Sequence, residues 1–204
     1  MEYPVNDLLA DAQEYEGRSF LGLDLQGKEL SFKEFYGCVF TRCSFLETTF
    51  TSCRFVDCEF RECNLGLCRV KDCSFSNTRF QDSQVIGVDW TEASWPKRGF
   101  LRTIDFYSCA LNHSTFIGLS LKGIDLTRCI ARDVDFTEAD LSRANLTHTD
   151  FSQSRFVHTD LTEADLTDAT NYSIAPKLNV LKKTKFSLPE AVSLLYGLDI
   201  ILTD

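Results

Sequence analysis

Nine cysteines and three histidines are the residues of this chain that could do chemistry. Cysteine and histidine bind zinc, and either can act as a nucleophile or a base beside a suitable partner. Here the cysteines keep a five-residue spacing with no Cys-x-x-Cys pair, and His113, His148 and His158 share no recognisable spacing with a nucleophile. A zinc site from cysteines stacked along the fold is the alternative. We predict that the chain is not an enzyme and holds no cofactor and no metal.

The cysteines belong to a repeat with a period of five. Large apolar residues recur at every fifth position from Phe20 to Phe100, and again, one residue out of frame, from Phe106 to Leu166, with only Ala131 small. A small, weakly polar residue stands two positions before most of the large ones, and all nine cysteines occupy that position. Such residues fill the gaps between large side chains. We therefore predict buried free thiols, which also suits a reducing compartment.

A period of five matches neither the helix period nor the strand period. It suits a square coil in which each five-residue side sends one large and one small residue inward. The runs Ala139–Arg143 (ADLSR) and Ala144–His148 (ANLTH) resemble the pentapeptide-repeat family, and the resemblance covers about Arg18 to Thr170. It implies an all-β fold, a right-handed quadrilateral β-helix with twenty residues per coil. At ~4.8 Å between stacked strands, such a solenoid would be about 36 Å long.

The repeat breaks near residues 90–104. Pro96 cannot donate to a strand ladder, Arg98 falls where a small inward residue is expected, and the frame shifts directly after them. Two interpretations stay open and are compatible: a bulge between two stacks, or a loop that contacts a partner. In the second case Trp95, Lys97 and Arg98 are candidate contact residues.

Both ends of the chain fall outside the repeat. We expect residues 1–17 to form an N-terminal cap, residues 18–170 the β-helix, residues 171–186 a linker, and residues 187–204 a C-terminal helix and short strand. Ser187-Leu188-Pro189-Glu190 has the pattern of a helix capping box with proline in the first turn.

The C-terminal tail has two candidate roles. A solenoid must protect its open ends, so an end cap is the simplest one. Its apolar surface also suits a two-fold dimer interface. The candidate dimer residues are Leu188, Val192, Leu194, Leu195, Leu198, Ile200 and Ile201.

Thirty acidic and twenty-one basic residues give the chain a formal charge of −9, which disfavours direct contact with a phosphate backbone. Arg18–Arg102 holds twelve bases and eleven acids, whereas Thr103–Thr170 holds five bases and eleven acids. Offsets of twenty residues, or nearly so, predict a line of carboxylates on one face of the second half. Such a face can be merely solvated, or it can give the rod a DNA-like electrostatic field. Its members are Asp105, Asp125, Asp165 and Asp168.

Three segments sharpen the family resemblance: the break Gly87–Pro96, the tail Phe186–Leu195 and the ending Leu198–Ile200. They resemble the Qnr quinolone-resistance, microcin-immunity and albicidin-resistance branch of the pentapeptide-repeat family. The resemblance implies a homodimeric DNA mimic that binds type II topoisomerases, DNA gyrase and topoisomerase IV, and protects them from poisons. The alternative is a pentapeptide-repeat interaction rod with another protein partner, because proteins that share this fold do not share a target.

Membrane and export signals do not occur in the sequence. No run of eighteen apolar residues is present, and the start of the chain lacks the basic and apolar stretches of a signal peptide. We therefore expect a cytoplasmic protein that contacts neither membrane nor nucleic acid directly.

Overall fold

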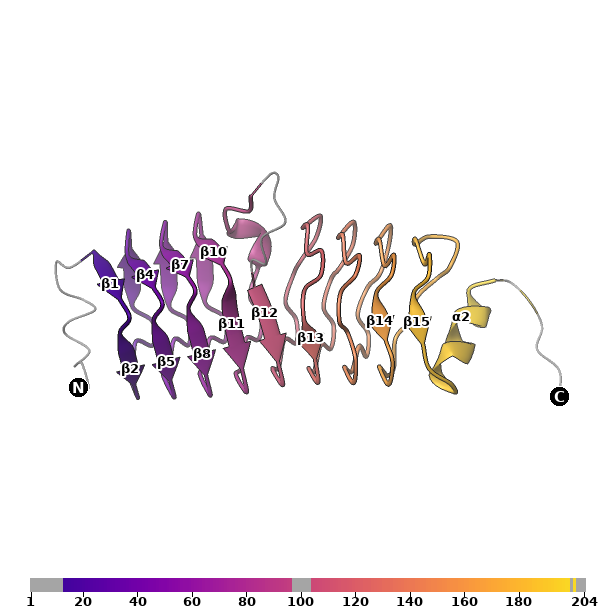
Figure 1. Ribbon diagram of the computed structural model, residues 1–204, viewed down its shortest axis with the longest axis horizontal. Coiled ribbons are helices and arrows are strands. Elements are labelled where there is room, and N and C mark those ends of the chain that lie inside the picture. The colour runs from indigo at the N-terminus through magenta and orange to yellow at the C-terminus, as the bar shows by residue number, and fades with distance from the viewer. Residues whose placement is uncertain (1–12, 97–103, 199, 201–204) are drawn as a thin grey trace.

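The computed structural model describes residues 13–96, 104–198 and 200. It is a β-solenoid of about eight turns with one short helix near its C-terminal end (Figure 1). The strand pairs in the described residues are parallel, and in the regular turns the partners are twenty residues apart, as in Phe20, Phe40 and Phe60. The predicted quadrilateral β-helix is confirmed.

Four sides of the coil follow one another along each turn. Side 1 contains β1 (Glu14–Glu16), β4 (Glu34–Tyr36), β7 (Arg54–Val56) and β10 (Ser74–Ser76). Side 2 contains β2 (Ser19–Leu21), β5 (Val39–Thr41), β8 (Glu59–Arg61), β11 (Thr78–Gln81), β12 (Ile104–Tyr107) and β13 (Leu126–Thr127). Side 3 is built from isolated bridges, and side 4 contains β3 (Glu29–Ser31), β6 (Thr49–Thr51) and β9 (Arg69–Lys71). β14 (Asp165–Leu166) and β15 (Lys185–Phe186) extend side 2 toward the C-terminus.

The core is a stack of the large repeat residues. On side 2 the rings of Phe40 and Phe60 are stacked with centroids 4.7 Å apart, and those of Phe60 and Phe80 follow at 4.9 Å. All nine cysteines are buried and free, and a typical thiol, that of Cys58, donates to the carbonyl of Phe35 one turn earlier at 3.3 Å. Burial raises the pKa of the Cys68 thiol to about 12. The position predicted for the cysteines is therefore confirmed.

The solenoid begins earlier in the chain than predicted. Glu14–Glu16 pairs in register with Glu34–Tyr36, so residues assigned to a cap belong to the first turn. The remainder of the expected cap, residues 1–12, lies outside the described residues.

The solenoid also ends later than predicted. Residues 171–186, which we expected to be a linker, form a further turn: Val180 bridges Asp160, and β15 pairs with β14. The five-residue repeat is interrupted at two positions, where Tyr172 and Ile174 are buried in place of regular repeat residues. The repeat resumes at Leu181 and Phe186. Because the two interruptions are adjacent, the five-residue repeat cannot be recognised in the sequence of the last turn.

The tail is short and lacks the predicted capping box. It contains η2 (Glu190–Val192) and α2 (Ser193–Tyr196), and no side chain caps η2. Instead, Ser187 Oγ accepts the backbone N–H of Asp168 at 2.8 Å, and Glu190 accepts that of Asn171. These two side chains satisfy backbone donors of the preceding turn, which the tail thereby closes.

Gly197 brings the end of α2 against the last turn. A Cβ added at Gly197 would lie 2.9 Å from Pro176 Cδ and 3.2 Å from the Cα of Ala175, so only glycine fits this approach. The predicted strand is not described, since residue 199 and residues 201–204 lie outside the described residues.

Candidate interaction surfaces

The predicted line of carboxylates exists in part. Asp125 bridges Asn145, and Asn145 bridges Asp165, so an asparagine interrupts the acidic column on side 2. Asp105 precedes them in the same column but is only 8% exposed, and its carboxylate accepts the backbone N–H of Asp125 at 2.9 Å. Asp168 lies off the column, at a corner, 3.7 Å from the ring of His148. Burial therefore makes Asp105 a poor contact candidate.

The other carboxylates of the column shape the turns that follow them. Asp125 Oδ1 accepts the N–H of Thr127, and Asp165 Oδ1 that of Thr167, both at 3.0 Å. This side-chain turn is the bond by which aspartate and asparagine stabilise tight corners. Partial burial opposes ionisation of Asp165, but hydrogen bonds from Lys185 and Thr167 outweigh it and lower the pKa of Asp165.

Asp150 on side 3 is held in the same way. Partial burial again works against the charged form, yet hydrogen bonds from Ser152, Asn171 and Arg132 keep the pKa of Asp150 well below its usual range. The Arg132 Nε to Asp150 Oδ2 distance is 2.7 Å. These partly exposed carboxylates therefore stabilise the turns of the solenoid in addition to giving its surface negative charge.

Side 1 carries a second acidic column, which we did not predict from the sequence. Asp140 and Asp160 bridge each other in successive turns, each accepts the N–H two residues on, and neither has an ion pair in the described residues. Glu138 lies exposed at the corner before Asp140. Their signal was present in the sequence, because they occupy the same repeat position as Asp125 and Asp165.

The predicted charge difference between the two halves disappears when the halves are bounded by the first and last turns that the structure shows. We call residues 13–96 the first stack and residues 104–186 the second stack. The first stack holds thirteen acids and nine bases, and the second holds eleven acids and nine bases. Glu14 and Glu16 enter the first turn, and the four lysines Lys177, Lys182, Lys183 and Lys185 enter the last. The acids differ between the stacks in arrangement more than in net charge.

The break lies on side 1, between Trp90 of side 4 and Phe106 of side 2. Figure 1 shows η1 (Trp90–Glu92) beyond β10, at the margin of the solenoid. Phe80 pairs with Phe106, so this turn contains twenty-six residues instead of twenty. The bond from Ser94 N–H to the carbonyl of Cys73, at 2.7 Å, keeps the start of the break in the ladder.

Trp95 folds back onto the core. Its indole N–H donates to the carbonyl of Trp90 at 2.7 Å, and it packs against the buried residues. A shallow depression of about 360 Å³ remains beside it on side 1. Its lining is Arg54, Val56, Ser74, Phe75, Ser76, Ser94, Trp95 and Pro96. Trp95 is therefore a packed residue, whereas Lys97 and Arg98 lie outside the described residues.

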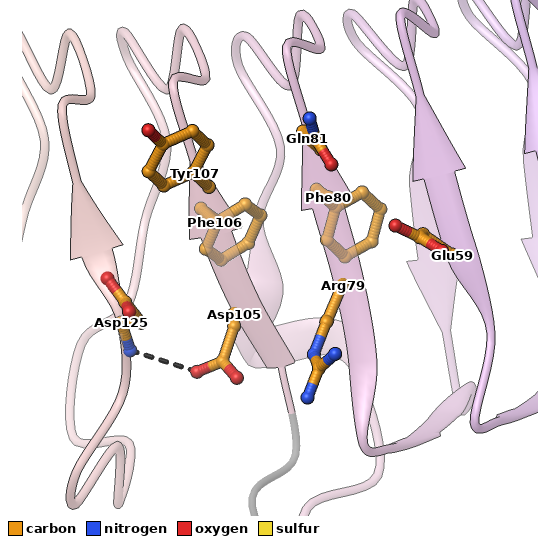
Figure 2. Close-up of a pocket in the computed structure, with 8 residues that line it drawn as sticks. All are labelled: Glu59, Arg79, Phe80, Gln81, Asp105, Phe106, Tyr107 and Asp125. Atoms are coloured by element: carbon orange, nitrogen blue, oxygen red, sulfur yellow. Dashed lines mark hydrogen bonds between the residues drawn. The ribbon is translucent and has the colours of Figure 1, made fainter.

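A second depression lies on side 2, where the two stacks meet (Figure 2). It measures about 190 Å³, with Phe80 and Phe106 in its lining. Arg79 extends from β11 beside Asp105 of β12, and Tyr107 and Asp125 line the other side (Figure 2). The depression is shallow and of mixed charge, and its lining among the described residues brings no nucleophile and base into contact.

The tail exposes a cluster of apolar side chains at the end of the rod. Leu188 is 80% exposed, and Tyr196, which was not among the predicted dimer residues, is 74% exposed. Val192 and Ile200 are also exposed, while Leu195 and Leu198 are half-buried. Leu194 packs against the core and so belongs to the cap. Ile201 lies outside the described residues.

The described part of the chain offers neither a metal cluster nor a membrane-spanning helix. Residues 13–96, 104–198 and 200 contain no group of three histidine, cysteine or acidic side chains placed to hold a metal. Over the same ranges, no helix is long and apolar enough to cross a bilayer.

A quadrilateral β-solenoid built on a five-residue repeat defines the class of this protein. A family profile described as a pentapeptide repeat region matches residues 33–116, and one described as pentapeptide repeats (8 copies) matches residues 104–143 and 139–170. Together the matches cover most of the chain. The chain belongs to the pentapeptide-repeat family.

Two solved structures of QnrB1, a plasmid-mediated fluoroquinolone resistance protein, are similar over nearly the whole chain. A trypsin-treated variant matches with a TM-score of 0.60 at 17% identity, covering 93% of this chain and 100% of that one. A second trypsin-treated variant matches with a TM-score of 0.55 at 17% identity, covering 95% and 100%. At this identity the likeness shows the fold. The search of curated protein sequences gave no significant match.

Proposed function

We propose that this protein binds a type II topoisomerase, DNA gyrase or topoisomerase IV, as a DNA-mimicking homodimer and protects it from topoisomerase poisons. The observation that carries the proposal is the whole-length similarity to QnrB1, which is described as a fluoroquinolone resistance protein. The resemblance of the break and the tail to the albicidin-resistance protein AlbG supports it further. The poison class is therefore that of quinolones, albicidin or microcin.

The surface is suited to a protein partner that normally holds DNA. The rod has a packed interior, so its contacts must be made by outward side chains. Asp125, Asp140 and Asp160 offer carboxylates without ion pairs in the described residues, and a net charge of −9 repels DNA itself. A complex of this kind would form in the cytoplasm, where topoisomerases act.

The homodimer would form through the tail. Leu188 and Tyr196 expose large apolar surfaces at one end of the rod, where a two-fold axis would pair each with its partner copy. Changing both to glutamate should give monomers in analytical ultracentrifugation, with the melting temperature of the rod retained. Changing Leu21 and Ile117 to glutamate is the matched control, since both are exposed far from the tail. A dimer that survives the tail changes contradicts this interface.

Binding to purified gyrase tests the partner. We expect Asp125→Asn, Asp140→Asn and Asp160→Asn together to weaken binding strongly at low salt and less at high salt, because surface attraction is screened. Asparagine keeps each turn, since Asn145 makes the same bond to Thr147.

The matched control removes three exposed charges of the first stack that lie away from side 3, by Glu16→Gln, Glu29→Gln and Asp72→Asn. If the parent protein does not bind gyrase or topoisomerase IV, the proposal fails. If both triple variants lose affinity equally, DNA mimicry by the second stack fails while the partner stands.

A second candidate function is an interaction rod for a different protein. The near-equal charge of the two stacks favours it, because several acids of the second stack are already neutralised by bases. Co-purification of the parent from a cell extract that contains gyrase distinguishes the two: gyrase in the eluate favours the first candidate, and its absence the second.

A further inference from the structure

One side of the solenoid carries no charged residue over four successive turns. On side 3, two outward residues flank the buried large residue of each turn, and Ile130 continues one of the two columns into the next turn. We call these residues the neutral face: Ser44, Leu46, Asn64, Gly66, Gln84, Ile86, Ala110, Asn112 and Ile130. In a chain with 25% charged residues, this is an unusual stretch.

The columns of the neutral face are in register. Bridges join Ser44 to Asn64, Asn64 to Gln84 and Gln84 to Ala110, and the carbonyls of the second column accept N–H groups from the turn before. The other three sides carry charges on the same turns. Those charged residues are Glu34 and Arg54 on side 1, Glu59, Arg61 and Arg79 on side 2, and Arg69, Lys71 and Asp89 on side 4.

Two leucines lie in notches left by glycines, which keeps the neutral face flat. A Cβ added at Gly66 would lie 3.2 Å from Leu46 Cδ1. At the adjoining corner, a Cβ at Gly87 would lie 2.7 Å from Leu67 Cδ2. Leu67 remains 55% exposed and Ile130 43% exposed, so apolar surface faces solvent along this side.

A charge-free, flat surface with a charged rim has the anatomy of the centre of a protein–protein interface. Interface centres are depleted of charged residues because a buried charge without a partner is costly, while the rim is polar. Here the rim is Arg42, Glu62 and Asp82 along one edge and Glu47 along the other. The neutral face itself contains no cation that could bind a phosphate or a lipid head group.

The charge beside the neutral face argues against a second copy of this chain as its occupant. Five turns at ~4.8 Å and three residues at ~3.3 Å give roughly 240 Å². A stable interface needs about 800 Å² on each partner, so the neutral face can only be the centre of a contact that extends over both corners. Two copies meeting there would bring the same acidic corners together in chains that each carry −9.

We propose that the neutral face is the uncharged centre of the contact with the topoisomerase, opposite a patch of aliphatic and amide side chains on that enzyme. This inference rests on the proposed function and deepens it. The carboxylates of the second stack would steer the encounter, and the neutral face would supply the part of the affinity that salt does not screen.

The sharpest test places a charge in the neutral face without changing its shape. Asn64→Asp and Gln84→Glu are nearly isosteric, and the turn at Asn64 is retained, because Asp24 makes the same bond to the N–H two residues on. Asn145→Asp is the matched control: it adds the same charge at the same repeat position on side 2. Each variant is first checked for an unchanged melting temperature.

We expect Asn64→Asp and Gln84→Glu each to raise the Kd for gyrase about tenfold or more at both low and high salt, since each buries an unpaired charge. Asn145→Asp should leave the Kd within about twofold or lower it at low salt. If the parent binds and the neutral-face variants bind equally well, this inference is overturned and the proposed function stands. If the parent does not bind the topoisomerase, both are overturned.

Discussion

The two stacks share the five-residue repeat but differ in the backbone form of their corners. In the first stack, three sides form regular three-residue strands. In the second stack, isolated bridges predominate, and corners such as Ala144 N–H to the carbonyl of Leu141 are closed by tight turns.

The difference follows the residue that precedes each large one. In the second stack it is usually an aspartate or asparagine whose Oδ1 accepts the N–H two residues on, as at Asp140 and Asn145. In the first stack Asp24, Asn64 and Asp89 make this bond. Asp24 and Asn64 lie on side 3, the side without a three-residue strand, and Asp89 precedes η1 on side 4. This side-chain bond therefore accompanies and stabilises the tight turn, although Ser44, Gln84 and Ala110 precede the same form of turn without it.

The cores differ as well. Aromatic rings stack from Phe20 to Phe106 on side 2, and leucines continue that column as Leu126, Leu146 and Leu166. Seven of the nine cysteines lie in the first stack, where they fill space beside rings. Alanines such as Ala139 and Ala144 take their place in the second stack.

Truncation of a core residue should show the largest difference between the stacks. We expect Phe60→Ala to cost about 3–5 kcal/mol of unfolding free energy, because the ring is stacked on both sides. Leu146→Ala, on the same side of the second stack, should cost about 2–3 kcal/mol. Urea unfolding followed by circular dichroism measures both. An equal or larger cost at Leu146 would contradict the comparison of the two cores.

Removal of a corner bond should have a smaller effect. Asp140→Ala should cost about 1 kcal/mol, because the N–H of Ser142 loses its acceptor, whereas Asp140→Asn should cost less than half of that. Ser74→Ala, at the same repeat position of the first stack, should stay within about 0.5 kcal/mol of the parent. Equal costs at Asp140 and Ser74 would show that the side-chain bond does not stabilise the turn.

Acid should weaken the second stack through Asp150. Its pKa is depressed in the folded state relative to an unfolded value of about 3.9. The stabilisation is therefore present above about pH 4 and is lost as the pH falls through the folded pKa. Asp150→Asn should make thermal stability less dependent on pH between 5 and 2. A parent and a variant with parallel melting temperatures over this range would refute the assignment.

Much of the fold could be predicted because the repeat is local and periodic. The large and small inward positions can be counted along the chain, so the coil and the buried cysteines follow directly. The last turn could not be predicted, because its buried residues Tyr172 and Ile174 do not stand at positions of the five-residue repeat. Ser187 and Glu190 were misread as a capping box because their partners, the N–H groups of the preceding turn, are distant in sequence.

The candidate site was harder to predict than the fold. The burial of Asp105 depends on the neighbouring turn at Asp125, and the packing of Trp95 depends on how the break folds back. The charge difference predicted between the halves depended on where the solenoid begins and ends, which the structure shows and the repeat does not. Asp140 and Asp160 could have been predicted, because they occupy the same repeat position as Asp125 and Asp165.

The most direct test of the account is a gyrase supercoiling assay in the presence of a quinolone. We predict that the parent protein restores supercoiling, and that a variant lacking residues 97–102 remains folded but protects less. That deletion removes the six residues by which the break exceeds a regular turn, while Trp95 stays in place. Supercoiling that stays inhibited at every concentration of the parent protein would contradict the account.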